Sequence, residues 1–108
     1  MNAFPYLAGK LACEAVPLET IAAAVGTPCY VYSAGAVRSQ LGTYQEAFAD
    51  RPALFCYAVK ANSNLAVIRT LAAAGAGADT VSGGEIARAL AAGVAPEKIV
   101  FAGIAKTD

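Results

Sequence analysis

The 108-residue sequence contains no histidine, and this absence narrows the chemistry that the chain can perform. Histidine is the side chain most often used as a general base near neutral pH, and it is the most common protein ligand of zinc. Any catalytic group of this chain must therefore be a lysine, an aspartate, a glutamate, a tyrosine or a cysteine. We expect no metal site.

Charge is also sparse. Eight basic and eight acidic residues cancel, and the lysines and arginines form no cluster along the sequence. Proteins that bind nucleic acids or anionic membranes usually carry such a basic cluster. We therefore expect a small molecule as the partner, and neither a nucleic acid nor a membrane.

Cysteines and long apolar runs are scarce as well. The three cysteines form no Cys-x-x-Cys pair, and an odd number cannot all be bridged within one chain. No apolar run approaches the roughly 18 residues that a membrane helix requires. The amino terminus also lacks the basic and apolar regions of a signal peptide. These absences predict a soluble, cytoplasmic protein with reduced thiols.

The sequence does contain enough apolar residues for a core, at 57%, and a regular alternation of predicted strands and helices. In the first half we expect a helix at 17–25, a strand at 29–32 and a helix from 33 to about 49. From residue 54 onward we expect strands at 54–60, 78–81 and 98–102, with helices at 64–74 and 83–92. Strand starts roughly 20 to 24 residues apart are typical of parallel strands joined by right-handed βα units.

This alternation is compatible with two α/β architectures, an open doubly wound sheet and the beginning of a closed (β/α) barrel. Periodicity does not separate the two. The sequence ends at Asp108, soon after a predicted strand, and leaves a parallel edge that a whole domain would cover. We interpret the chain as part of a larger protein.

Lys60 ends the first of these strands and is the main candidate for chemistry. In a strand, Cys56 and Ala58 share its face, and these small side chains leave room for a planar ligand. Active sites of α/β proteins lie at the carboxyl ends of parallel strands. A partly desolvated lysine there is an amine nucleophile suited to a Schiff base with an aldehyde cofactor. The alternative is a strand-terminal lysine that extends into water.

Asp79 and the segment Ser82–Glu85 follow on the next βα unit. If Asp79 points to the same side as Lys60, it orients the amine or the cofactor; the alternative is a carboxylate bonded to nearby backbone. Ser82 and Glu85 have the spacing of a capping box for the helix that follows. The two glycines between them also permit the close approach of a ligand.

Several segments together resemble the amino-terminal part of the diaminopimelate decarboxylases. They are Thr27–Ser33, Tyr57–Asn62 (YAVKAN), Gly77–Glu85 (GADTVSGGE), Lys98–Gly103 and Lys106–Thr107. That family consists of pyridoxal-phosphate enzymes of the alanine-racemase-like and ornithine-decarboxylase-like superfamily. Its members have a (β/α)8 TIM barrel followed by a β-domain. The resemblance implies that residues 1–33 are a leader of a strand and a helix that packs with the β-domain. It also implies that residues 34–108 form the first βα units of the cofactor-binding barrel, and that the barrel is truncated after its third strand.

The resemblance also implies roles for individual residues. Lys60 is expected to be the catalytic lysine that carries pyridoxal 5'-phosphate as an internal aldimine. Ala58 and Asp79 are expected to contact this cofactor, and Glu85 to belong to the supporting shell of the site. The implied reaction is the decarboxylation of meso-2,6-diaminopimelate to L-lysine and CO2, in lysine biosynthesis, by a homodimer. The 108-residue part alone is expected to be inactive.

Two alternatives that bind pyridoxal phosphate stay open, besides a small α/β domain with no cofactor, which requires that Lys60 faces solvent. Alanines at positions 78, 102 and 105 depart from the residues that are frequent in the family, so the substrate is less defined than the cofactor. A related decarboxylase of ornithine or arginine is the first alternative. A non-catalytic pyridoxal-phosphate carrier, with the lysine but without a β-domain, is the second.

Overall fold

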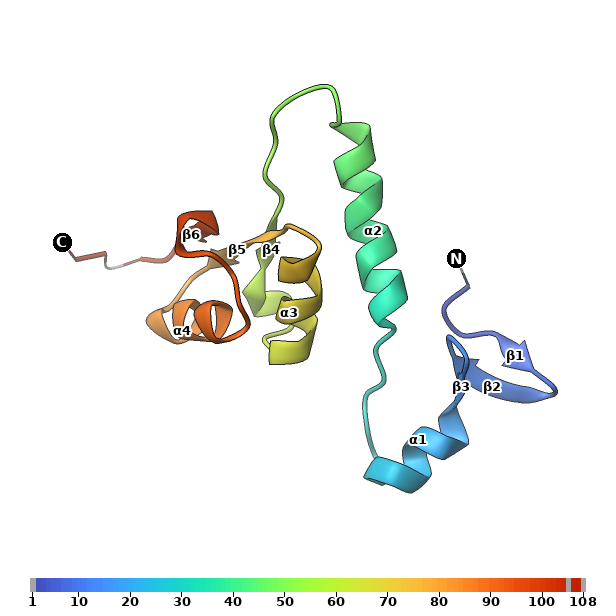
Figure 1. The fold of residues 1–108 in the computed structure, drawn as a ribbon. Helices are drawn as coiled ribbons and strands as arrows, with labels where there is room; N and C mark the ends of the chain where they lie inside the picture. Colours follow the sequence, from blue (N-terminus) through green and yellow to red (C-terminus); the bar gives the residue numbers. More distant parts are fainter. Residues whose placement is uncertain (1, 105, 108) are drawn as a thin grey trace.

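The computed structural model describes residues 2–104 and 106–107, which contain two three-stranded sheets and four α-helices (Figure 1). Position 105, one of the departures from the family, lies outside the described residues. The antiparallel sheet consists of β1 (Tyr6–Leu7), β2 (Lys10–Cys13) and β3 (Val16–Pro17). The parallel sheet consists of β4 (Cys56–Ala58), β5 (Gly77–Thr80) and β6 (Ile99–Phe101), in that order.

The helices are α1 (Leu18–Val25), α2 (Ala34–Ala47), α3 (Leu65–Ala73) and α4 (Gly83–Ala91), and short 3₁₀ turns occur at η1 (Val59–Ala61) and η2 (Pro96–Lys98). All four α-helices match the predicted ranges within two residues at each end. Helix α3 connects β4 to β5, and α4 connects β5 to β6. The predicted parallel βα units are therefore confirmed.

Local side-chain chemistry explains where three of these helices begin. Ser33 caps α2 by accepting a hydrogen bond from Ala36 N at 2.9 Å, and Asn64 caps α3 by accepting one from Ala66 N at 2.9 Å. Ser82 caps α4 in the same way. Each of these oxygens satisfies one of the backbone N–H groups that the first turn of a helix leaves unpaired.

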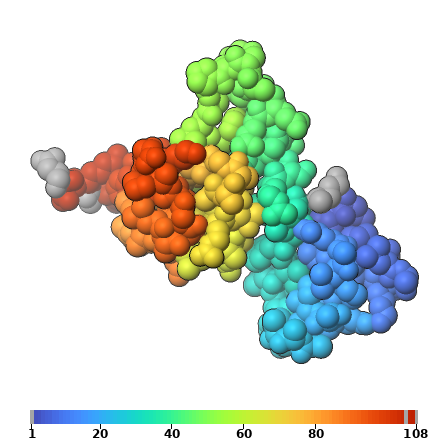
Figure 2. Space-filling view, viewed as in Figure 1, coloured from blue at the N-terminus to red at the C-terminus, as the bar shows by residue number. Residues whose placement is uncertain are grey.

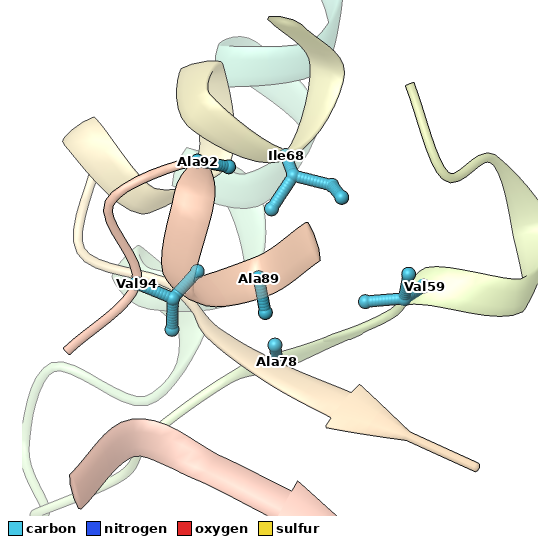
Figure 3. Close-up of a cluster of buried hydrophobic side chains, with 6 residues drawn as sticks. All are labelled: Val59, Ile68, Ala78, Ala89, Ala92 and Val94. Carbon is cyan, nitrogen blue, oxygen red and sulfur yellow. The ribbon is translucent and has the colours of Figure 1, made fainter. Parts of the chain in front are cut away.

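The main core lies between the parallel sheet and helices α3 and α4 (Figure 3). Its buried members are mostly small, and they are Val59, Ile68, Ala78, Ala89, Ala92 and Val94. Ala78 of β5 and Ala89 of α4 are both fully buried. Alanine on the sheet and on the helix lets the two elements approach closely, so small side chains are sufficient to close this interface.

Helix α2 adds a second cluster on the outside of α3. Leu41, Leu71 and Ala76 are its buried members, and Phe55 packs against them from the segment before β4. The ring of Phe55 also contacts Tyr44, with 5.8 Å between the ring centroids. These contacts fix the approach of the chain to β4.

The leader is tied to α2 by a carboxylate. Glu14 accepts hydrogen bonds from Ser33 Oγ at 2.8 Å and from Gly35 N at 2.7 Å. The Gly35 bond and then the Ser33 bond hold the pKa of the Glu14 carboxyl below its usual value. These two hydrogen bonds join the antiparallel sheet to the first turn of α2. A negative charge is also favourable at the amino terminus of a helix.

The chain is more extended than a compact domain of its length. Its radius of gyration is 16.4 Å, against about 13 Å for a compact domain of this size. In Figure 2 the leader and the parallel sheet lie on opposite sides of α2. The two sheets therefore do not share a core among the described residues.

The predicted strand at 29–32 is wrong. These residues have no strand pairing in the structure, and Tyr30 is 91% exposed. The tyrosines and the valine favour a pleated surface, but a strand also requires a hydrogen-bonded neighbour, and no described strand lies beside this segment. Conversely, none of the three strands of the antiparallel sheet was predicted. β1 and β3 have two residues each and β2 has four, which is too few for a readable alternation.

Candidate functional site at the carboxyl ends of β4 and β5

Lys60 lies just beyond β4, in the 3₁₀ turn η1, and its side chain is exposed in this chain. The prediction that it continues the strand, on the face of Cys56 and Ala58, is wrong. The strand ends at Ala58, and Val59 turns into the core, where it is fully buried. Val59 packs in the core between α3 and α4, and the amide of Asn62 donates to its carbonyl oxygen at 3.2 Å, which closes the turn that carries Lys60. Lys60 nevertheless stands at the carboxyl end of a parallel strand, as expected.

The backbone that follows Lys60 is held by hydrogen bonds. The hydroxyl of Tyr57 donates to the carbonyl oxygen of Asn62 at 2.9 Å. The side-chain oxygen of Asn62 in turn accepts from Asn64 N at 3.0 Å, immediately before α3 begins. Burial raises the pKa of the Tyr57 hydroxyl, so it remains a donor at neutral pH.

Asp79 lies on the face of the sheet that points away from α3 and α4. It pairs with Ala58 of β4 on one side and with Val100 of β6 on the other. Because side chains alternate along a strand, Cys56, Ala58, Gly77, Asp79 and Val100 share this face, which we call the open face. None of the five belongs to either buried cluster of the described residues.

The carboxylate of Asp79 has an unsatisfied oxygen. Its Oδ1 is buried, and it has no hydrogen-bond partner among residues 2–104 and 106–107. The alternative prediction was a carboxylate hydrogen-bonded to nearby backbone, but no backbone N–H of the described residues donates to this oxygen. A buried acceptor without a donor is unfavourable by about 1–3 kcal/mol. This orphaned oxygen is the feature of the open face that most clearly indicates a missing donor.

Cys56 shows that the open face has a negative character. Burial, and then the charge of Asp79, raise the pKa of the Cys56 thiol. The thiol is therefore protonated at neutral pH, and its Sγ lies 3.9 Å from the carbonyl oxygen of Lys98. A protonated thiol is a poor nucleophile, so Cys56 has the chemistry of a small apolar side chain.

Ser82 and Glu85 form a capping arrangement, as their spacing predicts. Ser82 Oγ accepts from Glu85 N at 3.1 Å, and Glu85 Oε1 accepts from Val81 N at 3.0 Å. In a capping box the glutamate bonds to the N-cap residue itself; here it bonds to the residue before it. The contacts of Glu85 explain how α4 begins after β5. Its membership of a supporting shell around the cofactor stays a prediction.

The structure thus brings the predicted site segments to one edge of the parallel sheet. Ala58 and Asp79 are paired neighbours, Lys60 follows Ala58 by two residues, and β5 contacts the turn η1. Glu85 lies farther along, bonded to the residue after β5. The sequence prediction missed Arg88, whose Nη1 donates to the carbonyl oxygen of Ser63 at 3.1 Å. No local pattern in the sequence indicates this contact, because it spans 25 residues.

Other kinds of site receive less support. Among the described residues, no three His, Cys, Asp or Glu side chains lie close enough to hold a metal ion. No helix within residues 2–104 and 106–107 combines the length and the apolar character needed to span a bilayer. A cavity of about 410 Å³ lies between α2, β4 and α3, but it is lined mostly by apolar side chains and does not include Lys60 or Asp79.

Comparison with known proteins identifies the family. A family model described as "Pyridoxal-dependent decarboxylase, pyridoxal binding domain" matches residues 34–108, which is more than half of the chain. The chain belongs to this family. Its similarity to the amino-terminal part of diaminopimelate decarboxylases, which the sequence motifs indicate, is confirmed by individual relatives.

The decarboxylase relatives are similar over nearly the whole chain. A diaminopimelate decarboxylase of Pseudomonas fluorescens is 52% identical over 107 residues, covering 99% of this chain and 26% of that protein. The corresponding protein of Aquifex aeolicus is 49% identical, covering 96% of this chain and 25% of that protein. This chain therefore spans about a quarter of the length of the curated relatives that it matches.

Solved decarboxylase structures share the fold. The diaminopimelate decarboxylase of M. jannaschii superposes with a TM-score of 0.89 at 37% identity, covering 98% of this chain and 26% of that one. The enzyme of Helicobacter pylori, complexed with L-lysine, gives a TM-score of 0.77 at 46% identity, covering 83% of this chain and 23% of that one. The βα units described here match the amino-terminal quarter of such decarboxylase structures.

Proposed function

We propose that this chain is the part of a pyridoxal-phosphate decarboxylase that attaches the cofactor through Lys60, and that the intact protein converts meso-2,6-diaminopimelate to L-lysine and CO2. Membership of the pyridoxal-binding family supports the cofactor, and identities of about 50% to diaminopimelate decarboxylases support the substrate. In this proposal the βα units are the first of a (β/α)8 TIM barrel formed from residue 34 onward. Residues 1–33 are a leader that packs with a β-domain, and the intact protein is a homodimer.

The orphaned oxygen of Asp79 is the observation that carries the assignment. It is buried on the open face, where Asp79 pairs with Ala58 of β4. Lys60 follows Ala58 by two residues. An amine attached to an aldehyde cofactor supplies the protonated nitrogen that this oxygen lacks. The small side chain of Ala58, which pairs with Asp79, leaves space for a planar ring on this face. The residues present therefore suit pyridoxal phosphate.

Each residue contributes a separate step. When bound, the cofactor withdraws electrons from the substrate carbon as its carboxylate departs. Lys60, whose side chain is exposed, would hold the cofactor through Nζ. When it does not hold the cofactor, its Nζ could accept or donate a proton. Asp79 orients these nitrogens by accepting a hydrogen bond, and Glu85 keeps the segment after Asp79 in place through Val81 N.

A turnover assay of the intact protein, as its gene encodes it, tests the proposed activity. We expect CO2 release from meso-diaminopimelate in the presence of pyridoxal phosphate, and none from ornithine or arginine. The Lys60→Ala variant is expected to lose this release, whereas Lys98→Ala is the matched control and keeps it. Release from ornithine or arginine alone would assign the protein to a related decarboxylase. Cofactor binding without release from any of the three would assign it to a non-catalytic carrier.

A further inference from the structure

Arg88 links helix α4 to the loop that follows Lys60. Its Nη1 donates to the carbonyl oxygen of Ser63 at 3.1 Å, across 25 residues of sequence. Ser63 comes three residues after Lys60 and directly before the N-cap of α3. We propose that Arg88 is a positioning residue for Lys60, because it holds this loop and thereby the turn that presents the amine. This inference rests on the proposed attachment of the cofactor to Lys60.

The face of α4 that carries Arg88 is hydrogen-bonded to the segments that follow β5 and the turn η1. Residues three apart on a helix are neighbours, so Glu85 and Arg88 lie on the same face of α4. Glu85 accepts a hydrogen bond from Val81 N, directly after the strand that carries Asp79. Arg88 donates to the loop after the strand that leads to Lys60. One helix face therefore connects the two segments whose side chains must meet at the cofactor.

Ser63 is the part of the loop where such a link has most effect. On one side of it, Asn62 is held by the Tyr57 hydroxyl, and on the other side Asn64 caps α3. Tyr57 belongs to β4 and Asn64 to the start of α3, so neither hydrogen bond reaches the neighbouring βα unit. Arg88 supplies a hydrogen bond between the units, in addition to the packing of Val59 against α4. A hydrogen bond from a charged guanidinium to a carbonyl is stronger than one between neutral groups.

The contact is exposed, so its expected effect is moderate. Loss of one such bond should loosen the loop by about three- to fivefold. The variant Arg88→Met keeps the helix-forming, apolar stem and removes only the charged donor. Arg88→Lys restores a charged donor and is expected to recover part of the effect. Arg69→Met is the matched control, since Arg69 is an exposed arginine on the adjacent helix α3 with no hydrogen bond to the 62–64 loop among the described residues.

Two measurements on the intact protein test the proposal without using turnover. The first follows the attachment of pyridoxal phosphate by borohydride reduction at increasing times, with the adducts on Lys60 and Lys98 quantified separately by peptide mass spectrometry. The second follows the hydrogen exchange of the amides at 62–64. In Arg88→Met we expect Lys60 labelling to slow, and exchange at 62–64 to accelerate, by about three- to fivefold. Labelling of Lys98 should be unchanged, and Arg69→Met should match the wild type in both measurements.

The outcomes separate this inference from the proposed function. If the wild type is labelled at Lys60 and Arg88→Met is labelled at the same rate, the positioning role is wrong and the proposed function stands. If Arg69→Met slows labelling as much as Arg88→Met, the effect comes from surface charge, and the positioning role is again overturned. If the wild type forms no adduct at Lys60, the proposed function fails. The role of Arg88 in positioning Lys60 for the cofactor then fails as well, even if hydrogen exchange shows that Arg88 stabilises the 62–64 loop.

Discussion

The parallel sheet depends on a glycine at the start of β5, and replacing it should have a large and directional effect. Gly77 is buried and pairs with Cys56 of β4. A Cβ atom at this position would overlap the carbonyl oxygen of Lys98 and would lie 2.9 Å from Cys56 Sγ. The backbone of Gly77 does not have a positive φ, so the obstacle is the space between the strands.

The size of the effect follows from which atoms are in the way. Inserting a methyl group into a packed core costs typically about 1–3 kcal/mol. A flexible side chain can move aside, but the Lys98 carbonyl is part of the backbone that leads into β6, so relief requires a shift of that strand. We therefore expect Gly77→Ala to lower the free energy of unfolding by about 3 kcal/mol, the upper part of that range. Displacement of β5 would also move Asp79.

The same substitution elsewhere in the chain provides a control of opposite sign. Gly42 lies in the middle of α2, and a Cβ atom there meets no atom within 4 Å. Alanine is better than glycine in a helix interior by about 0.5–1 kcal/mol, so Gly42→Ala should stabilise the chain. Urea unfolding followed by far-ultraviolet circular dichroism measures both variants. The reasoning is refuted if Gly77→Ala unfolds at the same urea concentration as the wild type, or if both variants shift in the same direction.

Three further predictions concern side chains that form hydrogen bonds. Ser82→Ala should reduce the free energy of unfolding by about 1 kcal/mol in urea titrations, because α4 loses its cap; an unchanged midpoint would show that the cap contributes nothing. Since the pKa of Glu14 is lowered in the folded chain, its contribution is present above the usual glutamate pKa and is lost as the pH falls through the lowered value. The melting temperature of Glu14→Gln should accordingly lie below that of the wild type near pH 7 and converge with it in acid; a constant difference across this range would contradict the assignment. Because burial raises the pKa of Tyr57, a spectrophotometric titration should contain a tyrosine step above the usual tyrosine value, and Tyr57→Phe should remove that step. If Tyr57→Phe instead removes an early step, the hydroxyl is not buried.

The elements that the sequence predicts well are those with local chemical signals at their ends. Ser33, Asn64 and Ser82 each cap a helix through a side-chain oxygen, and each was followed by apolar residues at helical spacing. After α3 and α4, Gly75 and Gly93 both adopt φ +95°, the left-handed conformation that glycine permits at the end of a helix. Signals of this kind depend only on neighbouring residues, so they can be read without knowledge of the fold.

The features that were missed depend on contacts between distant segments. The turns beside β2 place Ala8 and Glu14 at positive φ, at 48° and 54°, where neither residue type signals such a conformation. Tyr30 and its neighbours have strand-like residues but no strand beside them. For the site, βα spacing was enough to bring Asp79 beside Ala58. The 3₁₀ turn that removes Lys60 from the strand is closed by Asn62 N on the Val59 carbonyl oxygen, and no glycine or proline signals it in the sequence.

The central claim is that Lys60 holds an aldehyde cofactor, and borohydride reduction of the intact protein with pyridoxal phosphate tests it most directly. Peptide mass spectrometry then locates the pyridoxyl group. We predict an adduct on Lys60 that disappears in Lys60→Ala and forms more slowly in Asp79→Ala, because Asp79 then no longer supplies the acceptor on the open face. An adduct found only on Lys10, Lys98 or Lys106 would contradict the account.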